Sequence, residues 1–208
     1  MEPKLSLLAP DNCAVLLIDH QPQMAFAVDH IDRQLLLNNV VALAKAARVF
    51  KIPTVLTAVE SRSFSGLTWS ALEAALGGQK AIERSSINAW EDKPFVEAVH
   101  ATKRRKLVMA GLWTECCVAF PALGALDEGY EVYAVVDCCA GASRLAHETA
   151  VARMVQAGVV PITWLQFLYE LQRDWARHET YDAIMEIVAA HGGAHGIGVE
   201  YAKTMLPG

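Results

Sequence analysis

Short apolar runs alternate with longer amphipathic stretches along most of the chain. Six of these runs have the length and composition of buried parallel strands, at residues 13–19, 54–59, 81–84, 106–112, 130–137 and 159–163. Apolar residues at helical spacing predict helices at 32–51, 69–76, 94–102, 115–128, 144–157, 164–173 and 178–190. Strands that alternate with helices in this way predict an α/β fold, a three-layer α/β/α open parallel sheet of about six strands.

The end of the chain carries more apolar residues than a six-stranded sheet needs. Residues 164–171 (WLQFLYEL) are apolar on nearly every face, and the supply continues with Trp175, Tyr181, Ile184, Met185, Ile187 and Val188. A helix at the end of a domain normally has one apolar stripe, because its other side meets water. We therefore expect a main domain at 1–172 and a C-terminal helical extension at 173–208 that makes contacts between subunits. The alternative is that the extension folds back over its own sheet.

The composition narrows the classes of protein and of partner. Of the 208 residues, 53% are hydrophobic and 20% are charged, which is typical of a folded domain. The formal net charge of −5 counts against nucleic acid or an anionic membrane as a partner, since both need clustered basic residues. The start of the chain has no signal-peptide pattern, and no apolar run reaches 18 residues. These features predict a cytoplasmic protein.

The five cysteines indicate free thiols. Four of them form the adjacent pairs 116–117 and 138–139, and no pair has the C-x-x-C spacing of a zinc site. Neighbouring cysteines seldom bond to each other without strain. One interpretation is that the protein resides in a reducing cytoplasm with its thiols free. The more specific interpretation is that one of these thiols is reactive.

Reactive groups follow three of the predicted strands. The first strand ends in Asp19, the third in Arg84, and the fourth runs into a strand-to-helix turn that carries Cys116 and Cys117. Ligands gather beyond the carboxyl ends of the strands in open α/β sheets. The partial positive charge of a helix start, together with Arg84, is expected to lower the pKa of a cysteine there. Because the two cysteines point about 100° apart on a helix, at most one should face the site.

These groups fit nucleophilic catalysis. Asp19 could take the thiol proton, and backbone amides of the turn could stabilise an oxyanion. Each residue also has a structural interpretation, since an Asp can cap a helix, a helical Cys can pack in a core, and Arg84 can pair with Glu83 or Glu115. Three complementary groups at one edge of the sheet favour the catalytic interpretation.

The order of Asp, cation and Cys, with the local sequences around them, resembles the isochorismatase-like cysteine hydrolase family. Residues 15–21 (VLLIDHQ) are similar to the apolar strand and D-x-Q of that family, and 84–90 (RSSINAW) to its K-x-x-x-S-A-F segment. The most specific match is 111–118 (GLWTECCV), which is similar to G-x-x-T-[DE]-x-C-V. The resemblance extends to about residue 172, and the details are similar to the YcaC-like subgroup.

The resemblance implies a Rossmann-like hydrolase fold with Asp19, Arg84 and Cys117 as catalytic residues. Cys117 would be the nucleophile that forms a thioester with small amide, imide or related C–N substrates, with Cys116 as its inert neighbour. The amides of Trp113 and Cys117 would form the oxyanion hole, beside a cis peptide bond between Leu112 and Trp113. The resemblance also implies a homo-oligomer, namely an octamer.

Two positions depart from the family pattern. Arg84 stands where the family has a catalytic lysine; it stays charged, so we expect an electrostatic role only. Met24 stands where the family has an aromatic residue, which changes the wall of the substrate pocket. The residues expected to line that pocket are Met24, Phe26, Phe64, Trp90 and Trp113.

The sequence predicts neither a metal nor another cofactor. Nicotinamidases of the family hold a metal after the second strand, and residues 60–66 (ESRSFSG) contain no His there. His191 and His195 have the spacing of a zinc pair on a helix, but Gly192 and Gly193 between them argue against a helix, in a tail of flexible composition. His147 is expected to be a structural hydrogen-bonding residue.

Other functions stay open at this point. One alternative is isochorismatase-type hydrolysis, in which Asp19 acts without a covalent intermediate. Another is a thiol redox or sensing protein that uses Cys116 or Cys117, although a second thiol at C-x-x-C spacing is missing. A non-catalytic assembly protein would be favoured only if Asp19 and Cys117 were far apart. A dinucleotide-binding domain is disfavoured, because no G-x-G-x-x-G follows the first strand.

Overall fold

A computed structural model describes residues 7–206. Its core is a six-stranded sheet in the order β3-β2-β1-β4-β5-β6, with every neighbouring pair parallel. The strands are β1 (Cys13–Ile18), β2 (Thr54–Val59), β3 (Ile82–Arg84), β4 (Lys106–Gly111), β5 (Glu131–Val135) and β6 (Val160–Ile162). All six predicted strands are present, and the predicted α/β fold is confirmed.

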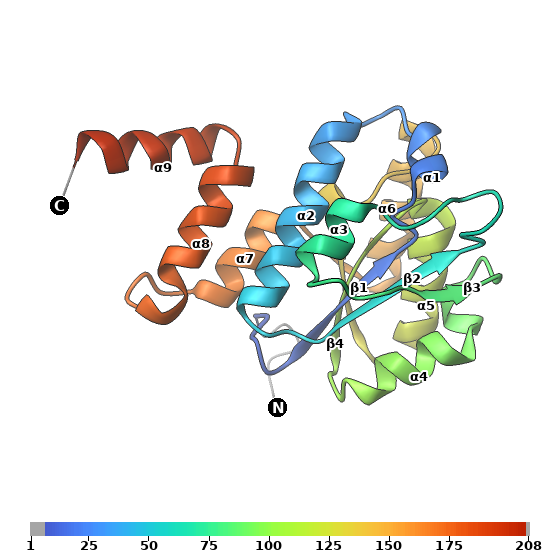
Figure 1. The fold of residues 1–208 in the computed structure, drawn as a ribbon. Coiled ribbons are helices and arrows are strands. Elements are labelled where there is room, and N and C mark those ends of the chain that lie inside the picture. Colours follow the sequence, from blue (N-terminus) through green and yellow to red (C-terminus); the bar gives the residue numbers. More distant parts are fainter. Residues whose placement is uncertain (1–6, 207–208) are drawn as a thin grey trace.

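Helices cover both faces of this sheet (Figure 1). The α-helices are α1 (Pro22–Phe26), α2 (Arg33–Val49), α3 (Ser70–Ala75), α4 (Lys93–Ala101), α5 (Ala119–Asp127), α6 (Arg144–Ala157), α7 (Trp164–Gln172), α8 (His178–His191) and α9 (Ala194–Met205). The short turns are the 3₁₀ segments η1 (Ala89–Glu91) and η3 (Val136–Cys138) and the π-helical segment η2 (Thr114–Val118). Helix α2 packs against α3, α7 and α8, while α5 packs against α6.

The strand register brings the predicted reactive residues to one edge of the sheet. In β1, Ile18 lies beside both Thr57 of β2 and Gly111 of β4. In turn Val59 at the end of β2 lies beside Arg84 at the end of β3. Because these strands are parallel, the residues that follow β1, β3 and β4 emerge from the same edge.

Gly111 lies where β4 passes closest to β1. A Cβ atom at this position would lie 2.5 Å from the carbonyl oxygen of Ile18 and 3.0 Å from its Cβ. Since the first of these atoms belongs to the backbone of a central strand, it cannot easily move aside. We expect Gly111→Ala to lower the free energy of unfolding by about 1–3 kcal/mol, measured by urea unfolding. Gly198→Ala is the matched control, because a Cβ atom there has nothing within 4 Å; an equal loss in both variants would contradict this explanation.

The C-terminal region begins after α7 and contains two helices. Helix α8 packs back on α2 and buries Ile184, Ile187 and Val188. Helix α9 packs on α8 and projects away from the sheet (Figure 1). Gly192 and Gly193 separate the two helices, so His191 and His195 lie on different helices, as the glycines between them led us to expect. Among residues 7–206, no helix is long and apolar enough to cross a membrane.

Candidate functional site

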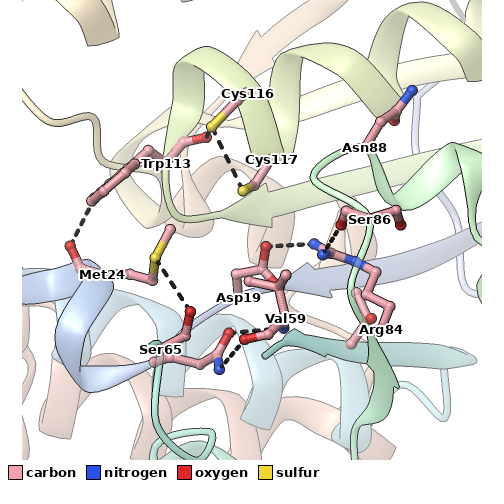
Figure 2. A network of polar contacts seen from close by, with 12 residues as sticks. Asp19, Met24, Val59, Ser65, Arg84, Ser86, Asn88, Trp113, Cys116 and Cys117 are labelled. Carbon is pink, nitrogen blue, oxygen red and sulfur yellow. Dashed lines mark hydrogen bonds and ion pairs between the residues drawn. The ribbon is translucent and has the colours of Figure 1, made fainter. Parts of the chain in front are cut away.

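Asp19 and Arg84 form a buried ion pair at the carboxyl edge of the sheet (Figure 2). Arg84 Nη2 donates a hydrogen bond to Asp19 Oδ2, and both side chains are fully buried. The other terminal nitrogen, Nη1, donates to the backbone carbonyl of Ser86. Arg84 therefore pairs with Asp19 rather than with its alternative partners Glu83 and Glu115. The guanidinium fixes the position of the carboxylate.

The backbone at Asp19 is held in an unusual conformation by its neighbours. Asp19 has a φ of 57°, a left-handed conformation that Asp adopts more readily than most residues do. Its amide donates to the carbonyl of Thr57 at 3.0 Å. The Gln21 side chain then bridges to β2, accepting from the Val59 amide and donating to the Val59 carbonyl at 3.1 and 3.0 Å. Sequence reasoning named Gln21 only as part of a motif, because its position between two strands is visible only in the fold.

The turn after β4 brings two thiols into contact. The peptide bond between Leu112 and Trp113 is cis, which is the form that the family resemblance implies. The segment η2 that follows is π-helical, and the Sγ atoms of Cys116 and Cys117 lie 3.7 Å apart. The expectation that at most one of the two faces the site assumed α-helical geometry, and the π-helical turn brings the two sulfurs into contact with each other. A π-helical turn is wider than an α-helical one and is frequent at functional sites.

Cys117 is directed toward Asp19, whereas Cys116 lies further toward the surface (Figure 2). Cys117 is only 3% exposed, and its thiol lies near enough to the Asp19 carboxylate for each group to influence the pKa of the other. Among the described residues, Asp19 Oδ1 has no hydrogen-bond partner and is buried. The three residues Asp19, Arg84 and Cys117, from three different strand ends, are thus brought together.

The ionisation of the two thiols differs from the sequence-based expectation. The hydrogen bond with Cys116 raises the pKa of Cys117, and burial and the charge of Asp19 raise it further. The hydrogen bond from Cys117 in turn lowers the pKa of Cys116 to about 7. The expectation of a lowered pKa for Cys117 is wrong, because its burial and its neighbours were not visible in the sequence.

The pKa of the Asp19 carboxyl group is set by opposing effects. Burial raises its pKa above the ordinary value of 3.8, while the charge of Arg84 and the hydrogen bond from Cys117 act in the opposite direction. A carboxyl group with a raised pKa beside a thiol can exchange a proton with that thiol.

One of the two amides expected to form the oxyanion hole is already engaged. The Cys117 amide donates to the carbonyl of Trp113 at 2.9 Å, and the amide of Cys116 donates to the same carbonyl at 3.2 Å. An oxyanion donor must be aimed at the reacting oxygen. The assignment of the Cys117 amide is therefore corrected, because the π-helical turn uses it internally, and the Trp113 amide stays as the candidate donor.

Met24 and Trp113 form one wall beside the two thiols (Figure 2). The indole Nε1 of Trp113 donates to the Met24 carbonyl at 2.8 Å, and the Met24 sulfur accepts from the Ser65 hydroxyl. In contrast, Phe26 and Phe64 are 69% and 66% exposed. The structure thus places Met24 and Trp113 at the site and leaves the two phenylalanines on the surface.

Trp90 has a packing role that differs from its assignment to the pocket. Its ring packs edge-on against Phe95 and Tyr130, and its Nε1 donates to Glu128 at 2.8 Å. A Cβ atom added to Gly124 of α5 would meet this ring at 2.7 Å. Trp90 therefore packs between α4 and α5. Its assignment to the substrate pocket is corrected, because its position in the family motif does not show which way the ring points.

The histidines hold structural positions. His147 Nδ1 is hydrogen-bonded to the Thr114 hydroxyl at 2.8 Å, which confirms its structural role. His191, the last residue of α8, is hydrogen-bonded to Asn38 of α2. His195 of α9 is hydrogen-bonded to Tyr169 of α7. In the part of the chain that the structure describes, no group of three His, Cys, Asp or Glu side chains could hold a metal ion.

Comparisons with known proteins agree with this geometry. The isochorismatase domain family matches residues 13–166. The protein named "Probable hydrolase YcaC" from Escherichia coli is 39% identical over 169 residues, which is 81% of each chain.

Two solved structures of YcaC are similar to this chain over nearly its whole length. One, from Escherichia coli, is described as an octameric hydrolase of unknown specificity; it has 34% identity and a TM-score of 0.92, covering 99% of this chain and 100% of that one. The other, from Pseudomonas aeruginosa with hexane-2,5-diol and covalent acrylamide, has 33% identity and a TM-score of 0.91, covering 97% and 100%. The chain therefore belongs to the isochorismatase family of hydrolases, and within that family it is similar to the YcaC proteins.

Proposed function

We propose that this protein is a metal-independent cysteine hydrolase of small amides, imides or related C–N substrates, with Cys117 as the nucleophile. The observation that supports it best is the convergence of a thiol, a carboxylate and a guanidinium from three strand ends. A nucleophile next to a base, with the base held by a third group, is the arrangement that covalent catalysis requires. The covalent acrylamide in the Pseudomonas aeruginosa relative adds support, because acrylamide reacts with nucleophiles.

The reaction begins with Cys117 as a thiol, since its pKa is raised. As its sulfur attacks the substrate carbonyl carbon, the proton passes to Asp19, and the amide of Trp113 stabilises the oxygen that becomes negative. The C–N bond then breaks, and Asp19 returns the proton to the leaving nitrogen. Finally Asp19 takes a proton from a water molecule that attacks the thioester. The C–S bond then breaks, the acid is released, and Asp19 passes the proton to the sulfur, which restores the thiol and the carboxylate.

Arg84 acts through Asp19. It offsets the effect of burial and so favours the ionised carboxylate that accepts the first proton. Because its own side chain stays charged, it stabilises negative charge without exchanging protons. This role explains why arginine can stand where the family pattern has lysine.

A screen of small amides and imides tests the proposed reaction. Samples quenched in acid during turnover should contain an acyl group on Cys117, detected by intact mass and peptide mapping. Turnover without any adduct on Cys117 would favour the reaction without a covalent intermediate, and activity that requires an added metal ion would refute metal independence.

We further propose that the protein is a cytoplasmic homo-oligomer, an octamer like the Escherichia coli relative. Helix α9 supports this assembly, because Ile197, Tyr201 and Met205 on one face of it are exposed and remain uncovered by the described part of their own chain. Residues four apart on a helix share a face, so these three form one apolar stripe. The boundary proposed for the assembly region is 173–208, with 1–172 as the hydrolase domain.

Substitution within this stripe should dissociate the oligomer. A charge buried in an apolar interface is strongly unfavourable, so the double variant Ile197→Asp with Tyr201→Asp should sediment as a smaller species than the full chain. Lys203→Asp, on the opposite face of α9, is the control and should keep the parent assembly. A parent protein that sediments as a single chain at micromolar concentration would contradict the proposal.

A further inference from the structure

Cys116 carries a thiol that the proposed hydrolysis does not use, although it lies beside the nucleophile Cys117. A hydrolase of this type needs one nucleophilic sulfur, yet a second sulfur lies 3.7 Å from the first. Cys116 is also the more accessible of the two, because Cys117 is almost completely buried. The two thiols point toward each other across the π-helical turn (Figure 2).

The sulfur separation fits a bridge of one atom better than a direct bond. A disulfide needs sulfurs about 2.0 Å apart and Cα atoms usually 4.4–6.8 Å apart, whereas adjacent residues have Cα atoms about 3.8 Å apart. Two bonds of about 2.3 Å from one central atom, at an angle between about 90° and 110°, would hold the sulfurs about 3.3–3.8 Å apart. The observed 3.7 Å therefore suits a single thiophilic atom bound by both sulfurs without movement of the backbone.

The number of protein ligands near the two sulfurs indicates which thiophilic atom the site suits. Zinc in a structural site takes four protein ligands, and among residues 7–206 no group of three or more His, Cys, Asp or Glu side chains is arranged to hold a metal ion. A trivalent organoarsenic centre, with one carbon bound to arsenic, has only two positions to exchange. Two thiols satisfy those positions completely.

We propose that Cys116 and Cys117 form a dithiol site that binds a trivalent organoarsenic compound through both sulfurs. Each thiol replaces one hydroxyl group on arsenic: two S–H and two As–O bonds break, two As–S bonds form, and two water molecules leave. The arsenic keeps its oxidation state, so no oxidant or reductant is needed.

Cys116 reacts first and Cys117 closes the ring. The thiolate is the reacting form of cysteine, and Cys116 combines partial exposure with a pKa of about 7. Once arsenic is attached to Cys116, the second thiol is a neighbour at high effective concentration, which makes the second step intramolecular. The complex should therefore be far tighter than the bond to either thiol alone.

The chain contains an adjacent pair that serves as an internal comparison. Cys138 and Cys139 are also neighbours in sequence, but both are buried, and burial raises the pKa of both thiols. Neither is therefore available for the first step in the folded protein. Selective binding at 116–117 depends on the fold and not merely on two adjacent cysteines.

The experiment treats the folded full chain with phenylarsine oxide and follows the adduct by intact mass. The parent protein should keep one phenylarsenic group in excess 2-mercaptoethanol and lose it to 2,3-dimercaptopropanol. Cys116→Ser and, as a second variant, Cys116→Ala should bind at least about 100-fold more weakly, because only one sulfur remains. The double variant Cys138→Ser with Cys139→Ser should behave like the parent, and circular dichroism checks that each variant is folded.

Three results would overturn the proposal: loss of the adduct from the parent in monothiol, its retention by either folded Cys116 variant, or its mapping to 138–139. The measurement needs no substrate. A failure of the proposed hydrolysis would therefore leave this site standing, and a failure of this site would leave the hydrolysis untouched.

Discussion

Cys117→Ala should abolish hydrolysis while leaving the fold intact. Loss of the nucleophile from a catalytic unit lowers kcat by about 10⁴- to 10⁶-fold, and we expect a loss in that range for any substrate found in the screen. The same variant should no longer take up acrylamide at the position of Cys117, which can be followed by peptide mass before a substrate is known. Stability should fall only slightly, since the change removes one sulfur atom from a buried position.

Cys116→Ala is the matched control for this prediction. It removes the same atom from the adjacent residue, and the proposed mechanism gives Cys116 no step, so activity should be retained. The pKa of Cys117 should fall in this variant, because the hydrogen bond with Cys116 is the largest cause of its increase. Alkylation of Cys117 should therefore reach half its maximal rate at lower pH than in the parent. If Cys117→Ala were as active as the parent and as Cys116→Ala, Cys117 would have no part in the mechanism.

The six strands and the parallel sheet could be predicted because apolar runs alternate with amphipathic stretches along the chain, whereas the order of the strands in the sheet comes from the structure. All six residues of β1 are buried, and such a run suits only a strand covered on both faces. Because ligands gather at the carboxyl edge of such a sheet, the ends of the first and third strands indicate Asp19 and Arg84 as site residues. Those two residues form a direct ion pair in the structure.

The positions and pKa values of several site side chains could not be predicted from the sequence, because they depend on irregular backbone or on contacts between distant elements. The contact between the Cys116 and Cys117 sulfurs lies in a π-helical turn, and no residue type predicts such a turn. The direction of the Cys117 pKa shift depends on burial and on contacts across three strands. The Trp90 ring packs against residues from α4 and the loop before β5, a contact that sequence spacing does not contain.

The arrangement of the C-terminal helices could be predicted from the sequence only in part. Gly192 and Gly193 argued against one helix through His191 and His195, and they form the turn between α8 and α9. Helix propensity resumes directly after them at Ala194. Many of the apolar residues at 164–188 that indicated an excess are buried within the chain, because α7 and α8 pack on α2. The exposed stripe on α9 lies beyond them and was not part of that expectation.

Arg84→Met should destabilise the protein by about 3–5 kcal/mol at neutral pH, because it leaves the buried Asp19 carboxylate without its partner. The pKa of Asp19 is already raised above 3.8, and the loss of Arg84 should raise it further. A carboxyl group whose pKa is raised by folding favours the folded state when it is protonated, and this contribution is lost as the pH rises through that pKa. The destabilisation should therefore shrink as the pH falls below the new pKa of Asp19.

Two further variants separate the charge of Arg84 from its packing. Adding Asp19→Asn to Arg84→Met removes the unpaired charge, so it should recover much of the lost stability at neutral pH while hydrolysis stays absent. Arg84→Lys restores a cation, the one that the family pattern has at this position, and should keep both the fold and measurable activity. Urea unfolding between pH 4 and pH 8 provides the measurement. A loss of stability in Arg84→Met that does not vary with pH, or that the Asp19→Asn change fails to relieve, would show that Arg84 contributes packing rather than charge.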